Sequence, residues 1–95
     1  MIGQFAFSKA GHDKDRLYVI VAQEGDFVYL CDGKGKTLAE PKKKRKKHIQ
    51  PVNCRVEQEL LNRLTEGAKV YPEEIRCAIR QYDLKRKKET QKEMQ

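Results

Sequence analysis

Short apolar segments separated by polar turns fill the first third of the chain. Residues 4–8 carry aromatic side chains at alternate positions, residues 16–22 are dense in β-branched and aromatic side chains, and residues 27–31 repeat that composition. Such segments predict β-strands, in which alternate side chains point to opposite faces of a sheet. The intervening residues 11–15 and 24–26 combine glycine with charged side chains and predict tight turns.

The next stretch predicts the remaining strands of this unit. Asp32-Gly33 is a strong turn signal that can open a two-residue hairpin, and Thr37-Leu38 is a candidate for a short return strand. Residues 47–50 are a candidate for the last, short strand. Several short strands joined by tight turns indicate a small barrel or meander, and closing the sheet would remove its exposed edges.

The predicted strands contain five aromatic side chains: Phe5, Phe7, Tyr18, Phe27 and Tyr29. Large side chains fill the interior of a small barrel, so the core is the expected place for most of them. Strict alternation along residues 17–21 divides that segment between two faces. It leaves Tyr18 or Tyr29 as a candidate for an exposed ring with a stacking role.

The spacing of apolar positions changes after Pro51. Apolar side chains then recur at helical spacing, first over residues 56–64 and again over residues 75–82. Gly67 predicts the end of the first helix, and Pro72, which two glutamates follow, predicts the start of the second. We therefore expect two short helices after the β-rich unit.

The predicted fold class is mainly β with C-terminal α-helices. We expect residues 1–52 to form the barrel, residues 53–83 to form a helical extension packed on the barrel or on a partner, and residues 84–95 to form a charged, frayed tail. A chain of 95 residues is long enough for one small domain with a modest core.

The most unusual feature of the sequence is a run of six basic residues at positions 42–47. The chain has a formal net charge of +7, and residues 1–50 hold 11 basic against 6 acidic side chains. Because six adjacent like charges repel one another, we expect the run to contribute nothing to a core and little to the fold. It is predicted to be a loop that binds a polyanion such as nucleic acid.

Other interpretations of the basic run stay open beside phosphate binding. A mobile, solvated loop would keep the chain soluble, although mixed charges would do so with less repulsion. The segment PKKKRKK also resembles a nuclear-import signal, which requires a nucleated host. Binding to anionic lipid is less favoured, because neither an amphipathic basic helix nor a lipidation site accompanies the run.

The remaining composition predicts a cytoplasmic protein that does not enter a membrane. No apolar run approaches the roughly 18 residues that suggest a membrane span, and the first residues lack the pattern of a secretory signal. Cys31, Cys54 and Cys77 are odd in number and far apart, so we expect reduced thiols, with Cys31 in the core.

No chemistry beyond binding is predicted. The cysteines form no C-x-x-C pair, and His12 and His48 have no neighbours at metal-ligand spacing, so we expect no metal site. The sequence contains no phosphate-binding loop of P-loop spacing and no nucleophile paired with a base at a familiar spacing. We therefore expect a protein that is not an enzyme and has no cofactor.

The order of these segments resembles a known family. The opening strand with SKAGHDK, the apolar strand LYVIV, the FVYLCDG strand and turn, and the basic stretch ending in KHIQP are together similar to a KOW-type domain. Among KOW domains they most resemble the large-subunit ribosomal protein family L-fourteen-e and small bacterial KOW-domain RNA-binding proteins. The resemblance covers about residues 3–51 and does not extend to the predicted helices.

The resemblance implies a small SH3-like β-barrel that binds structured RNA, usually ribosomal RNA. It implies RNA contacts from the loop between the first two strands and from the basic stretch before the last strand. Carried onto this sequence, the residues are Ser8, Lys9, Gly11, His12, Lys14, Arg16, Lys42, Lys43, Lys44, Arg45, Lys46, Lys47 and His48. The chain departs from the pattern at Asp15, where KOW domains have a glycine; Asp tolerates positive φ less easily than Gly.

Two functions follow as hypotheses. The first is an RNA-binding protein, acting on ribosomal RNA or the translation machinery, that clamps the phosphate backbone with basic loops. Its C-terminal helices would contact a second partner, such as a ribosomal protein, or pack on the barrel. The second is a protein-interaction module whose barrel binds a ribosomal, polymerase or other acidic protein. Without the resemblance, Lys9, Lys14 and Arg16 would be read as surface charges paired with Asp13 and Asp15.

Overall fold

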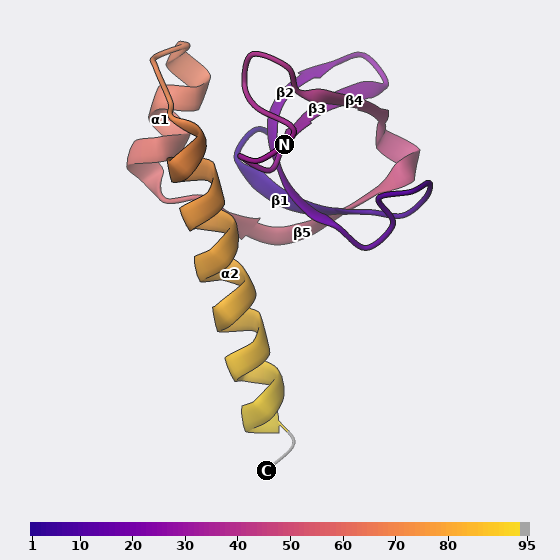
Figure 1. The fold of residues 1–95 in the computed structure, drawn as a ribbon, viewed down its shortest axis with the longest axis vertical. Coiled ribbons are helices and arrows are strands. Elements are labelled where there is room, and N and C mark those ends of the chain that lie inside the picture. Colours follow the sequence, from indigo (N-terminus) through magenta and orange to yellow (C-terminus); the bar gives the residue numbers. More distant parts are fainter. Residues whose placement is uncertain (94–95) are drawn as a thin grey trace.

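The computed structural model describes residues 1–93 and contains one curled antiparallel sheet followed by two α-helices (Figure 1). The elements are β1 (Gln4–Ser8), β2 (Leu17–Glu24), β3 (Phe27–Cys31), β4 (Lys42–Arg45), the 3-10 helix η1 (Lys46–His48), β5 (Ile49–Arg55), α1 (Gln58–Glu66) and α2 (Pro72–Glu93). The prediction of a mainly β chain with C-terminal helices is confirmed.

The strands lie in the order β4-β3-β2-β1-β5. β4 and β5 are therefore the two edges, although only the three residues of η1 separate them in the chain. In a flat sheet these edges would lie four strand spacings apart, about 19 Å. The four Cα steps from Arg45 to Ile49 reach at most about 15 Å, so the sheet has to curl. Figure 1 shows the strands arranged around a ring, but within residues 1–93 no ladder joins β4 to β5, and the sheet is open.

Two apolar clusters cover the two faces of the sheet. The inner cluster consists of Ala6, Tyr18, Ile20, Val28, Leu30 and Ile49. The outer cluster joins the sheet residues Phe5, Val19, Val21 and Cys31 to Val56, Leu60, Val70 and Ile75 from the helical half. The predicted alternation along β2 is thus confirmed. Tyr18 is only 1% exposed, so its candidacy as an exposed ring was wrong, whereas Tyr29 is half-buried.

The connection between β3 and β4 differs from the prediction. Asp32-Gly33 does not open a two-residue hairpin, because the Asp32 carboxylate accepts hydrogen bonds from the backbone N–H groups of Lys34 (2.8 Å) and Lys36 (3.0 Å) and closes a wider turn. Thr37-Leu38 is not a strand. The return strand is the basic run itself, since Lys42–Arg45 pairs with β3 over four residues.

The helix boundaries fall at the predicted residues, Gly67 and Pro72. α1 ends at Gly67, which adopts the left-handed conformation (φ 72°), and α2 starts at Pro72. α2 is not short: it has 22 residues and includes residues 84–93, predicted as a charged tail. Fraying of that segment stays a prediction, and Met94 and Gln95 lie outside the described residues.

The first turns of α2 are attached to the sheet. The ring of Tyr82 stacks on that of Phe5 with centroids 4.6 Å apart. The Arg76 guanidinium donates a hydrogen bond of 2.8 Å to the Gly33 carbonyl in the β3–β4 connection. Gly33 lies so close to the start of α2 that a Cβ there would be 2.4 Å from the Pro72 carbonyl oxygen. Figure 1 shows α2 running past the ring of strands, with its last turns extending away from the sheet.

Candidate nucleic-acid interface

The loop between β1 and β2 is a compact turn. The backbone N–H of Asp15 donates 2.8 Å to the Ser8 carbonyl, and that of Lys14 donates 3.3 Å to the Gly11 carbonyl. Both corners of the turn have left-handed backbones, at Gly11 (φ 86°) and at Asp15 (φ 70°). The turn therefore has positive φ at Asp15, a conformation that non-glycine residues adopt less easily than glycine.

Asp13 points from this loop into the protein and is only 5% exposed. Its carboxylate accepts hydrogen bonds from the hydroxyls of Ser8 (3.0 Å) and Tyr18 (3.1 Å). Ser8 itself is 1% exposed and also donates to the Ala10 carbonyl at 3.1 Å. A buried carboxylate requires such donors, because burial without partners would cost several kcal/mol.

Two lysines of the basic run complete the cluster around Asp13. The ammonium of Lys42 lies 2.6 Å from one carboxylate oxygen and that of Lys44 lies 2.7 Å from the other. Lys44 also donates to the Ala10 carbonyl (2.8 Å) and to the Ser8 hydroxyl. The side chains of Lys42 and Lys44 are 30% and 11% exposed. The expectation that the run contributes little to the fold was therefore wrong: half of β4 anchors the β1–β2 loop.

The electrostatics follow from this packing. Burial by itself would raise the pKa of Asp13, but hydrogen bonds from Lys42, Lys44, Ser8 and Tyr18 outweigh it and hold the pKa well below its usual value. Burial, with the hydrogen bond and negative charge of Asp13, raises the pKa of Tyr18 to about 12. Asp13 is thus an anion and Tyr18 a neutral donor across the physiological pH range.

Backbone contacts hold the rest of the run beside the start of the β1–β2 loop and beside the β2–β3 turn. The Lys9 N–H donates 2.8 Å to the His48 carbonyl at the end of η1, and the Lys46 N–H donates 2.8 Å to the Asp26 carbonyl in the β2–β3 turn. The two segments predicted to bind RNA, far apart in sequence, are therefore neighbours in space. The open alternative that Asp13 pairs with cations of its own loop is wrong, since its ion pairs are with Lys42 and Lys44.

The predicted site residues fall into three groups by exposure. The exposed residues are Lys9, Gly11, His12, Lys14, Arg16, Lys43, Arg45 and Lys47. The half-buried residues are Lys42, Lys44, Lys46 and His48, and Ser8 is buried. Lys42, Lys44 and Ser8 hold the loop against β4, and the exposed cations are the ones positioned to meet a ligand.

Arg16 lies at a second site. It lines a groove of about 570 Å³ together with Lys34 from the β3–β4 connection and Arg86 from α2, and the Arg86 guanidinium lies 5.2 Å from the centre of the Phe7 ring. Asp15, Asp32 and Asp83 line the same groove, so its charge is mixed. Sequence reasoning missed Lys34 and Arg86; the only signal for Arg86 was the basic composition of residues 85–88.

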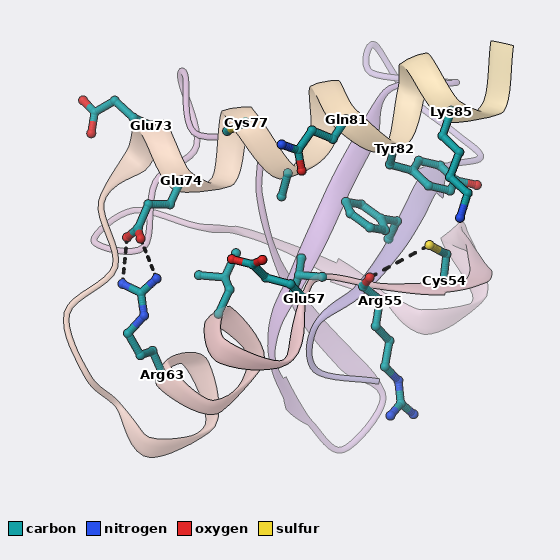
Figure 2. Close-up of a pocket in the computed structure, with 14 residues that line it drawn as sticks. Cys54, Arg55, Glu57, Arg63, Glu73, Glu74, Cys77, Gln81, Tyr82 and Lys85 are labelled. Atoms are coloured by element: carbon teal, nitrogen blue, oxygen red, sulfur yellow. Dashed lines mark hydrogen bonds and ion pairs between the residues drawn. The ribbon is translucent and has the colours of Figure 1, made fainter. Parts of the chain in front are cut away.

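A cleft of about 540 Å³ separates α2 from β5 and α1. Figure 2 shows Arg63 of α1 and Glu74 of α2 pointing toward one another at one end of the cleft, where the guanidinium donates a hydrogen bond of 3.0 Å to the carboxylate. This contact lowers the pKa of Glu74. Cys54 and Cys77 line the cleft from β5 and α2, and both are free thiols.

Neither a metal-binding cluster nor a membrane-spanning helix is found in the described part of the chain. Among residues 1–93, no cluster of three or more His, Cys, Asp or Glu side chains is arranged to hold a metal ion. Within the same residues, no helix has the length and apolar character needed to span a membrane. Comparison with known proteins finds no family model and no curated protein that matches the chain.

Proposed function

We propose that the protein is a non-enzymatic RNA-binding protein that holds the phosphate backbone of structured RNA against the β1–β2 loop and the β4–η1 segment. One observation carries the proposal: the carboxylate of Asp13 ties Lys42 and Lys44 to the loop, with distances of 2.6 and 2.7 Å. The two segments that the KOW resemblance assigns to RNA binding are thereby fixed side by side.

The curled sheet supports this assignment. Five short antiparallel strands and a 3-10 helix between β4 and β5 are the arrangement expected of an SH3-like barrel, the fold that the KOW resemblance implies. We propose that the open sheet is a barrel of this type, and that its resemblance to the ribosomal family L-fourteen-e extends to its ligand.

The mechanism is electrostatic clamping by a rigid surface. Lys9, Lys14 and Lys47 are exposed and belong to segments held by the Asp13 cluster. Because the cluster fixes the backbone beneath them before binding, less conformational entropy is lost when they contact phosphates. Recognition of backbone and shape, with little reading of base edges, is the usual way in which proteins bind folded RNA.

The salt dependence of binding tests the clamp. If about six phosphates are neutralised, the slope of log K against log salt for an RNA hairpin should be on the order of −4 to −5. The double variant Lys9→Gln/Lys47→Gln should reduce the slope by about 2. Lys69→Gln/Arg80→Gln removes the same charge from the linker before α2 and from α2, and should leave most of the binding. A slope near zero for the unaltered protein would refute the proposal.

Ribosomal RNA is the expected target, because the resembling families bind it. Crosslinking in cells, followed by sequencing of the attached RNA, should recover a defined site in large-subunit ribosomal RNA. Capture of one acidic protein that persists after nuclease treatment would support a protein-interaction module and contradict the RNA proposal.

A further inference from the structure

The basic strand divides its cations between the two faces of the sheet. Lys42 and Lys44 point toward Asp13, whereas Lys43 and Arg45 alternate with them and are exposed. In the ladder between β3 and β4, Arg45 lies opposite Phe27 and Lys43 lies opposite Tyr29. These four outward side chains form a surface that we call the β3–β4 platform.

The platform places two cations over one aromatic ring. The Lys43 ammonium is 4.4 Å from the centre of the Phe27 ring, and the Arg45 guanidinium carbon is 5.3 Å from the same point. Lys43 also lies 6.0 Å from the centre of the Tyr29 ring. Phe27 and Tyr29 are half-buried, so neither residue is fully covered by the rest of the protein. The rings attract the cations through cation–π interaction and limit their freedom.

The charge on this face is not neutralised by the protein. Among residues 1–87, whose side chains the structure describes, neither Lys43 nor Arg45 makes an ion pair, while Lys42 and Lys44 share Asp13. The carboxylate of Glu24 accepts a long hydrogen bond of 3.4 Å from the Tyr29 hydroxyl and forms no ion pair with either cation. Two like charges held at one ring repel each other, and an anion between them removes that repulsion.

We infer that the β3–β4 platform binds an unpaired nucleotide of RNA, with its base against Phe27 or the Arg45 guanidinium and its phosphate at Lys43 and Arg45. Planar rings and guanidinium groups stack on bases of any sequence, and adjacent cations hold the backbone of a single strand. The inference rests on the proposed function and adds a contact to bases, which the phosphate clamp does not make.

Two oligomers of equal charge test the platform. One is a single-stranded oligouridylate of about ten nucleotides, and the other is a base-free oligomer with the same number of phosphates. Fluorescence anisotropy should show that the protein binds the base-carrying oligomer roughly tenfold more tightly. In Phe27→Leu, which keeps an apolar side chain, most of this preference should disappear, while the affinity for the base-free oligomer and the salt slope stay unchanged.

Control variants separate stacking from folding and from charge. Phe7→Leu removes a ring that also lies beneath a guanidinium, that of Arg86, but on another surface; it should leave the preference for bases intact. Arg45→Lys keeps the charge and loses the planar group, so it should lower the preference without altering the stability measured by thermal melting. Arg45→Lys shows whether the preference for bases depends on the platform even if Phe27→Leu folds poorly.

The remaining outcomes distinguish failure of the β3–β4 platform from failure of the proposed function. Equal loss for both oligomers in Phe27→Leu, or no preference for bases in the unaltered protein, would overturn the platform. If an RNA hairpin binds with the expected salt slope but neither oligomer binds, the platform fails and the proposed function stands. If no RNA binds, the proposed function fails. Binding of a polyglutamate peptide that depends on Phe27 would identify a protein-docking surface and overturn the inference.

Discussion

The ammonium of Lys44 lies 2.7 Å from the carboxylate of Asp13, a residue 31 positions earlier in the chain. This contact joins the basic strand β4 to the loop between β1 and β2. Both groups are largely withdrawn from solvent, with side-chain exposures of 11% and 7%. Loss of one partner from a pair in such surroundings leaves a charge with fewer donors than it needs.

Replacing Lys44 should therefore destabilise the fold. We expect Lys44→Met to lower the free energy of unfolding by about 2 to 3 kcal/mol, with Lys42 still bound to Asp13. The neighbouring change Lys43→Met is the matched control, because Lys43 is exposed, and it should stay within about 0.5 kcal/mol of the unaltered protein. Urea unfolding followed by circular dichroism measures both values; equal effects would show that the buried contact does not contribute.

The stability should also depend on pH through Asp13. Its pKa in the folded chain lies well below the unfolded value of about 3.9. The stabilisation is fully present above that value and is lost as the pH falls toward the folded pKa. The difference in Tm between the unaltered protein and Asp13→Asn should therefore shrink from pH 5 toward pH 2. Asp26→Asn, at an exposed aspartate in the β2–β3 turn, is the control for removal of a surface carboxylate and should change the Tm little.

A methyl group at Gly33 should disturb the junction of the sheet with α2. Gly33 has φ of 76°, and its Cβ would approach the Pro72 carbonyl oxygen to 2.4 Å. We expect Gly33→Ala to lower the free energy of unfolding by about 2 kcal/mol or more. Gly35→Ala, two residues away with open space around it, should change it by less than about 1 kcal/mol. Similar melting curves for the two variants would argue against a tight junction.

Asp15 has a left-handed backbone (φ 70°), the one such non-glycine residue among residues 1–93. Asp15→Gly removes that strain and should raise the stability by about 0.5 to 1 kcal/mol, whereas Asp15→Ala should lower it by about 1 kcal/mol. Both variants also remove a negative charge beside the proposed phosphate contacts, so both should bind an RNA hairpin more tightly. Tighter binding by Asp15→Gly alone would assign the effect to backbone geometry.

The three thiols should react in the order of their exposure. Burial and, next, the charge of Asp32 raise the pKa of Cys31 to about 12, so almost no thiolate exists there at pH 8. Cys77 is exposed and Cys54 is half-buried. A colorimetric thiol reagent should label Cys77 first, Cys54 more slowly, and Cys31 only after unfolding. Labelling of Cys31 at the rate of Cys77 would contradict its place in the core.

Local patterns predicted the elements whose partners are close in the chain. β1 and β3 were predicted with their observed bounds, and Gly67 and Pro72 marked the observed helix boundaries. Each depends on alternation or on the φ preferences of single residues, which a short window contains. The division of β2 between two faces was also predicted, since Tyr18 and Val19 belong to opposite clusters, but the burial of Tyr18 was not.

β4 could not be predicted in this way. Six adjacent cations look like a solvated loop, and the carboxylate that neutralises two of them lies about thirty residues away. Lys42 and Lys44 are two positions apart, which suits one face of a strand. Only the tertiary fold shows that the Asp13 carboxylate lies on that face. The division between inward and outward cations, and therefore the β3–β4 platform, depends on the same long-range contact and could not be predicted from the sequence.

The open edge of the sheet has a consequence for how copies of the chain meet. β4 has an unpaired side, so its backbone groups could accept a strand from another molecule. Joining two copies there would oppose the basic run to itself, and the charges repel such pairing. Polyanions or concentrated salt neutralise or screen this repulsion. Edge-to-edge pairing of two copies through β4 should therefore be most favourable at high ionic strength, where light scattering would detect it.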